Sequence, residues 1–102
     1  MPYESKLACA DADTLFEAIL SLRNAEECYR FFSDLCTVKE LRDMCQRFHI
    51  AKLLDQKVSF QIIMSQIPAS TATIGRVNRS LKYGENGYQI VLPRLKKPAS
   101  GR

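Results

Sequence analysis

Histidine is almost absent from this chain of 102 residues, and closely spaced cysteine pairs are absent altogether. The only histidine is His49, and no C-x-x-C pair occurs among the four cysteines, Cys9, Cys28, Cys36 and Cys45. Zinc sites usually present their ligands in close pairs, so the sequence predicts no structural metal. We expect the cysteines to be reduced and mostly packed as small apolar side chains.

Long apolar runs are also missing. No stretch approaches the roughly 20 residues that a membrane-spanning helix needs. Residues 1–10 contain Glu4 and lack the apolar segment of a secretory signal. We therefore expect a cytoplasmic protein, and a chain of this length suffices for one domain rather than two.

No arrangement of side chains points to catalysis. Cys45 and His49 lie four residues apart, but Cys45 falls on the apolar stripe of a predicted helix and no third group orients the histidine. A glycine-rich phosphate loop of the required form is missing too. The sequence therefore predicts a protein that is not an enzyme and that needs no cofactor.

Acidic residues are scarce in the C-terminal part of the chain. Residues 1–58 hold 8 Lys or Arg and 10 Asp or Glu, a net charge of −2. Residues 59–102 hold 7 Lys or Arg and one acid, Glu85, a net charge of +6. A basic half on an otherwise balanced domain indicates a polyanionic partner, although part of the excess lies in a predicted basic tail over residues 96–102.

Helical periodicity is the main pattern that the sequence does contain, and it predicts an all-α fold. We expect a flexible arm over residues 1–12 and a single helical domain over residues 13–95. A side chain able to cap a helix precedes each of the first five apolar stripes, at Asp13, Asn24, Thr37, Ser59 and Ser70. In the third helix the residues expected to face inward are Leu41, Met44, Cys45, Phe48, Leu53 and Leu54.

The predicted helix ends depend on proline and glycine. Pro68 should end the fourth helix, because proline disfavours helical geometry in the residue before it. The fifth helix should run from Thr71 to about Leu81, and the glycines of a turn over residues 83–87 can take positive φ. Residues 88–95 are ambiguous: they have strand-like composition, but an isolated strand has no partner. We favour a short helix there, kinked or ended near Pro93.

Residues 60–79, within a segment of about 59–82, are typical of a helix-turn-helix. In this motif one helix crosses the DNA backbone and the next enters the major groove. Apolar residues must hold the two helices at a fixed angle, and the residues placed to do so are Ile63, Ile67, Ala69, Ile74 and Val77. An ordinary helical hairpin with a basic face is the alternative interpretation.

The outward face of the predicted second helix is small and polar at its start and cationic further on. Base edges should be met by Thr71, Ala72 and Gly75, with Ser70 at the helix start. Phosphates should be met mainly by Thr73, Arg76, Asn78, Arg79 and Lys82. A helical protein–protein or RNA-binding module is the competing function. RNA readers display aromatic platforms on a basic surface, and no aromatic residue lies on this cationic face, which favours duplex DNA.

The same segment resembles the recognition-helix region of the Trp repressor family, and within it the YerC/YecD group. The resemblance rests on three short segments, ASTATI (69–74), RVNRSL (76–81) and YG (83–84). Two upstream segments, CTVKEL (36–41) and AKLL (51–54), extend it. It covers about residues 14–95. It implies an all-α regulator of operator DNA in which two chains interlock through their N-terminal helices. The apolar faces of the first three predicted helices independently favour a homodimer, because they exceed what one small bundle can cover.

The resemblance also implies a ligand pocket. The family's recognition-helix arginine corresponds to Arg76, and a nearby serine to Ser80. The second ligand arginine falls at Gln46 in an ungapped match and at Arg47 with a shift of one residue. In the Trp repressor, which tryptophan switches, a glycine follows the first arginine. Val77 takes that place here, and its isopropyl group intrudes on the space meant for the indole ring of tryptophan. We therefore expect DNA binding without tryptophan, or with some other small molecule.

Overall fold

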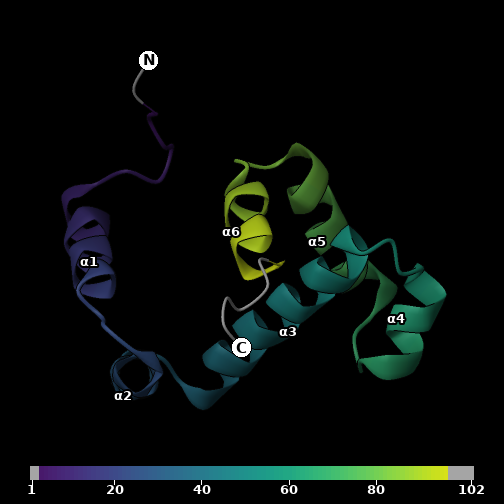
Figure 1. Ribbon diagram of the computed structural model, residues 1–102, viewed down its shortest axis with the longest axis horizontal. Helices are drawn as coiled ribbons and strands as arrows, with labels where there is room; N and C mark the ends of the chain where they lie inside the picture. Colours follow the sequence, from purple (N-terminus) through teal and green to yellow (C-terminus); the bar gives the residue numbers. More distant parts are fainter. Residues whose placement is uncertain (1–2, 97–102) are drawn as a thin grey trace. The chain divides into compact units, whose positions relative to one another are not determined.

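The computed structural model describes residues 3–96, and within this range it contains helices and no strand, so the predicted all-α class is confirmed (Figure 1). The helices are α1 (Ala10–Leu20), α2 (Ala25–Leu35), α3 (Val38–Asp55), α4 (Phe60–Gln66), α5 (Thr71–Tyr83) and α6 (Gly87–Lys96). The chain divides into an N-terminal unit up to Val38 and a C-terminal unit from Lys39 on. The single domain over residues 13–95 stays a prediction.

The N-terminal unit begins its first helix earlier than predicted. The cap of α1 is Cys9, whose Sγ accepts a hydrogen bond from the backbone N–H of Ala12 at 3.4 Å. The predicted cap, Asp13, instead lies in the first turn with Asp11. Carboxylates there are stabilised by the positive end of the helix dipole. The predicted arm of residues 1–12 is therefore wrong for residues 10–12, which are helical. Residues 1–2 of that arm, and all of the predicted tail except Lys96, lie outside the described residues.

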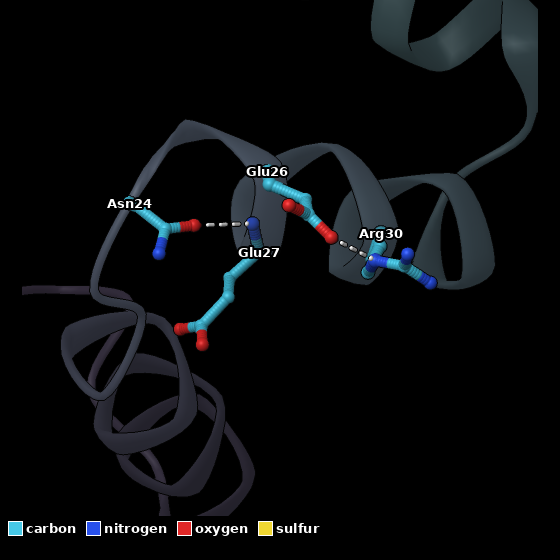
Figure 2. Close-up of polar contacts among 4 residues, drawn as sticks. All are labelled: Asn24, Glu26, Glu27 and Arg30. Carbon is cyan, nitrogen blue, oxygen red and sulfur yellow. Dashed lines mark hydrogen bonds and ion pairs between the residues drawn. The ribbon is translucent and has the colours of Figure 1, made fainter.

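Helix α2 begins at the predicted cap. Figure 2 shows the side-chain oxygen of Asn24 accepting the backbone N–H of Glu27 at 2.9 Å. The Glu27 carboxylate in turn accepts the backbone N–H of Arg23 at 2.8 Å. One turn further on, Arg30 Nε lies 2.9 Å from Glu26 Oε2 in an exposed ion pair. The bonds made by Asn24 and Glu27 satisfy backbone N–H groups that have no partner inside the helix.

Residues 3–38, the described part of the N-terminal unit, contain no buried residue. Neither α1 nor α2 contains a buried residue. Large apolar side chains stay open to solvent: Phe16 is 55% exposed, Leu20 83% and Tyr29 73%. The half-buried rings of Phe31 and Phe32 meet edge to face, with centroids 5.5 Å apart. The apolar stripes of these helices are present as predicted, and no described residue of the N-terminal unit covers them fully.

The C-terminal unit contains the core. Its buried cluster joins α3, α4, α5 and the α4–α5 connection through Ile50, Ala51, Ile63, Ile67, Ile74 and Val77. The predicted contact set between α4 and α5 is confirmed, since its four larger members are buried and Ala69 packs against them.

The predicted inward face of α3 is partly wrong. Met44 and Cys45 are exposed, whereas the fully buried residues of the helix are Ile50 and Ala51. The reason is tertiary, because α4 and α5 pack on the C-terminal half of α3 through these two residues. Cysteine packing was also expected in error: the thiols are free, but Cys9, Cys28 and Cys45 are exposed and only Cys36 is half-buried.

Serine caps and a proline set the bounds of α4 and α5, as predicted. Ser59 Oγ accepts the N–H of Ile62 at 3.3 Å, and Ser70 Oγ accepts the N–H of Thr73 at 3.1 Å. Helix α4 ends where Ile67, just before Pro68, takes extended backbone angles of φ −127° and ψ 130°. Helix α5 continues to Tyr83, two residues beyond the predicted end.

The segment after α5 differs from the prediction in two details. Gly84 caps α5 with φ −84°, and the residue that takes positive φ in this turn is Asn86, at 66°. The expected helix over residues 88–95 is confirmed as α6, but Pro93 lies inside it and does not end it. Proline removes one hydrogen bond within a helix. Here the helix is held in place by Leu92, which is 3% exposed, and by the Gln89 side-chain amide, which donates to the carbonyl of Leu81.

Among residues 3–96, no helix combines the length and the apolar character that a membrane crossing requires.

Candidate nucleic-acid interface and adjoining cleft

Helix α5 has an inner and an outer side because its apolar residues recur at helical spacing. Ile74, Val77 and Leu81 are buried, and α5 contacts both α4 and α6. The residues between them point away from the core. Of the residues predicted to contact DNA, six are exposed and three are half-buried; the exposed ones are Ser70, Thr71, Ala72, Arg76, Arg79 and Lys82, and the half-buried ones are Thr73, Gly75 and Asn78.

The outer side of α5 carries a shallow hollow. It is lined by Ala72, Gly75, Arg76, Arg79 and Ser80. A Cβ atom added at Gly75 would meet nothing within 4 Å, so another molecule can approach the backbone closely there. Neither arginine of this hollow forms an ion pair with any residue that the structure describes. The surface therefore offers cations to an external anion.

The start of α5 is fixed by a small hydroxyl network. Besides capping the helix, Ser70 Oγ lies 3.2 Å from Thr73 Oγ1. Thr73 is half-buried and faces a cleft on the inner side of α5. Its predicted contact with phosphate stays a prediction, but its position makes it a link between the cleft and the leading end of the helix.

That cleft lies between α3, α5 and the start of α6, and its volume is about 540 Å³. This is within the usual range of small-molecule sites, about 300–1,000 Å³. The structure brings together here all five residues of the predicted pocket, Gln46, Arg47, Arg76, Val77 and Ser80. Four further residues line the cleft that the sequence did not assign to it: Lys39, Asp43, Thr73 and Tyr88. Of these, the sequence predicts Thr73 only as a phosphate contact.

The charges of the cleft are arranged around Asp43. Lys39 Nζ lies 2.8 Å from Asp43 Oδ2. This hydrogen bond raises the pKa of Lys39. It is also the main cause that lowers the pKa of Asp43. Burial has a smaller, opposite effect on Asp43, and the nearby charges of Lys39 and Arg47 add to the lowering. Arg47 and Arg76 form no ion pair within residues 3–96. Among the described residues, neither guanidinium group therefore has a carboxylate within ion-pair distance, although the charge of Arg47 acts on Asp43.

The apolar part of the cleft is made by one core residue and one aromatic ring. Val77 is only 3% exposed and belongs to the buried cluster, so its side chain contributes to the cleft wall while packing inward. Tyr88 is half-buried, and its ring centroid lies 6.3 Å from that of Phe48 on α3. The contact between these rings ties α6 to α3 beside the cleft.

Comparison with known proteins gives one family and several relatives. The model of the Trp repressor protein family matches residues 10–96. The uncharacterized protein YerC of Bacillus subtilis (strain 168) is 46% identical over 92 residues, covering 90% of this chain and 88% of that protein.

Two solved structures share the fold. One is described as a candidate Trp repressor from Staphylococcus aureus; it is 49% identical, with a TM-score of 0.83 over 88% of this chain and 90% of that one. The other is a TrpR-like protein from Eubacterium eligens ATCC 27750; it is 48% identical, with a TM-score of 0.84 over 88% of this chain and 93% of that one.

Proposed function

Because this chain belongs to the Trp repressor family, we propose that it is a sequence-specific, DNA-binding transcriptional regulator that inserts α5 into the major groove of duplex DNA. The observation that carries this proposal is the outer face of α5. Its leading end is small and open, and its arginines further along form no ion pair with any described residue. A buried core holds the helix against α4. A helix-turn-helix requires both features, an accessible face on the helix that enters the groove and a core that holds this helix in place.

The residues of α5 fall into two groups according to the length of their side chains. Thr71, Ala72 and Gly75 are short enough for the helix to enter a groove about 12 Å wide, and they meet base edges there. Arg76, Arg79 and Lys82 are long cations that bind phosphates and fix the register. Sequence preference therefore resides in the first turns of α5, and general affinity in its second half.

Selection of bound duplexes from a random pool, followed by a salt titration of the selected duplex, tests this assignment. Arg79→Ala should weaken binding to all duplexes about equally and lower the salt slope by about 1. Arg94→Ala is the matched control, because Arg94 is an exposed arginine on α6 outside the interface. A changed sequence preference in Arg79→Ala would contradict the phosphate role. Equal or tighter binding of single-stranded RNA would contradict the proposal as a whole.

We also propose that the protein acts as a homodimer on DNA in the cytoplasm. The uncovered apolar side chains of α1 and α2 support a partner for the N-terminal unit. A symmetric dimer presents two copies of α5 to half-sites roughly 34 Å apart. Light scattering at tens of micromolar chain, on the order of usual assay concentrations, should give the mass of two chains. A clean monomer there would overturn the dimer.

We further propose that L-tryptophan is not the effector. Val77 packs at the cleft wall, and most of the other lining residues are polar or charged. Overfilling a packed site costs about 1–3 kcal/mol, which corresponds to one to two orders of magnitude in affinity. Calorimetric titration should show no heat of binding. A dissociation constant on the order of tens of micromolar, usual for a metabolite sensor, together with tighter DNA binding, would overturn this proposal.

A further inference from the structure

The cleft between α3 and α5 carries an excess of positive charge that the residues described by the structure do not neutralise. Its lining includes three cations, Lys39, Arg47 and Arg76, and one carboxylate, Asp43, which leaves a formal charge of +2. The carboxylate is already held by Lys39 at 2.8 Å. The two arginines have no ion-pair partner among the described residues.

The uncharged polar groups add to this preference for anions. The amide of Gln46 and the hydroxyls of Thr73 and Ser80 can each donate a hydrogen bond. An ammonium group, by contrast, would have to compete with Lys39 for the only carboxylate of the lining. A guanidinium presents parallel N–H donors that match phosphate or carboxylate oxygens in pairs. A zwitterionic amino acid with a neutral side chain would leave the charge of +2 unchanged.

We infer that this cleft binds a small organic dianion, a phosphate monoester or a dicarboxylate, whose charged end meets Arg47 and Arg76 and whose organic part lies against Val77 and Tyr88. The volume of about 540 Å³ accommodates both parts. Recognition by the two arginines follows from the charge and the donors, and selection among dianions follows from the wall formed by the valine and the tyrosine.

The site also has a consequence for DNA binding, which rests on the proposed function. Arg76 and Ser80 line both the cleft and the outer hollow of α5. A dianion in the cleft engages Arg76 and places negative charge beside the surface that would meet DNA phosphates. Occupancy of the cleft therefore weakens DNA binding, so that the ligand acts to release the operator.

The binding test uses the full chain in a phosphate-free buffer, titrated in a calorimeter with phenyl phosphate, with succinate and with L-tryptophan. We expect one of the two dianions to bind and L-tryptophan not to. The phosphate and dicarboxylate arms decide which class of dianion the cleft prefers. If neither dianion binds, or if L-tryptophan binds more tightly than both, the inference is wrong.

Three matched variants locate the binding. Arg47→Gln should lower the affinity for the bound dianion about tenfold, the lower range for a charge-assisted partner that solvent screens. Arg94→Gln, on α6, should leave it unchanged. Arg79→Gln, which changes a residue of the outer hollow alone, should lower DNA affinity and leave dianion affinity unchanged. Dianion binding that Arg47→Gln does not weaken would overturn the assignment to this cleft.

The effect on DNA is measured with the selected duplex at constant ionic strength, with sodium chloride replacing the dianion in the reference titration. The dianion should lower DNA affinity in the native chain and in Arg94→Gln, and much less in Arg47→Gln. Tighter DNA binding with the dianion would contradict the release mechanism. If no duplex binds at all, the proposed function fails, while the calorimetric result still decides whether the cleft binds a dianion.

Discussion

Gly84→Ala is expected to destabilise the protein because of one short approach between backbone atoms. Gly84 caps α5, and its N–H donates to the carbonyl of Ser80 at 3.0 Å. A Cβ atom added at Gly84 would lie 2.4 Å from that same carbonyl oxygen and 3.2 Å from its carbon. The oxygen belongs to the helix backbone and cannot rotate away as a flexible side chain could.

The size of the effect follows from this overlap. Ordinary van der Waals contact begins at 3.4 Å, so the oxygen and the new carbon must separate by about 1 Å. Overpacking of this kind typically costs about 1–3 kcal/mol, and a shift that breaks the capping hydrogen bond adds about 1 kcal/mol. We therefore expect a loss of about 2–4 kcal/mol in the free energy of unfolding. Each kcal/mol lowers the Tm of a domain this size by about 4–8 °C.

Gly75→Ala provides the matched control. It introduces the same methyl group into the same helix, but the added Cβ meets nothing within 4 Å. Alanine inside a helix is more stable than glycine by about 0.5–1 kcal/mol, so this variant should gain stability. Urea unfolding of both variants at equal chain concentration measures the difference, since equal concentration keeps any contribution of self-association the same. If the free energy of unfolding of Gly84→Ala lies within about 0.5 kcal/mol of that of the native chain, the close contact between residue 84 and the Ser80 carbonyl is wrong.

Three further predictions concern the same unit. Ser70→Ala removes the oxygen that accepts the N–H of Thr73, so urea unfolding should show a loss of about 1 kcal/mol, whereas Ser70→Asp keeps an acceptor and should restore most of it. Ile74→Ala empties a position that is 0% exposed and should cost about 2–5 kcal/mol, while a loss below about 1 kcal/mol would place Ile74 outside the core. Lys39→Gln should let the pKa of Asp43 rise toward its ordinary value, because the hydrogen bond from Lys39 is the main cause that lowers it; carboxyl NMR titration measures this. A carboxyl whose pKa is lowered in the folded state contributes stability that is lost as the pH falls through that pKa. Acidification should therefore lower the free energy of unfolding less in Lys39→Gln than in the native chain. An unchanged Asp43 titration would contradict the ion pair.

The parts of the fold that the sequence predicts well are those set by neighbouring residues. Ser59 and Ser70 cap their helices because a serine oxygen reaches an N–H three residues ahead. Ile67 is extended because Pro68 follows it. The i, i+3 and i+7 spacing of Ile74, Val77 and Leu81 marks the inner side of α5 for the same reason, since helical geometry places them on one face.

The errors arise where distant residues decide. The inner face of α3 is set by its packing against α4 and α5, which buries Ile50 and Ala51 and leaves Cys45 exposed. The left-handed residue of the last turn is Asn86 and not a glycine, because asparagine also tolerates that conformation. At Gly84 the requirement is steric, a close approach to Ser80, and no positive φ is involved.

The cleft illustrates a different limit. Its five predicted residues came from family resemblance, and no spacing rule would have joined Gln46 to Ser80. Lys39 and Asp43 were detectable only as an i, i+4 pair on α3, a pattern that usually marks an exposed ion pair. Tyr88 reaches the cleft because its ring lies beside Phe48. That contact follows from how α6 docks, and the composition of residues 88–95 does not encode it.

The adjacency of Arg76 and Val77 constrains how a ligand could act on α5. Successive residues of a helix point about 100° apart, so Val77 is held in the core while Arg76 lies at the edge shared by the cleft and the outer hollow. Moving α5 as a whole would disturb Val77 together with the fully buried Ile74. Redirecting the exposed Arg76 side chain disturbs neither. A ligand of the cleft can therefore change the charge presented to DNA at far lower cost than it can change the position of the helix. Regulation through Arg76 predicts that a bound dianion alters DNA affinity and its salt dependence while the sequence preferred by Thr71, Ala72 and Gly75 stays the same.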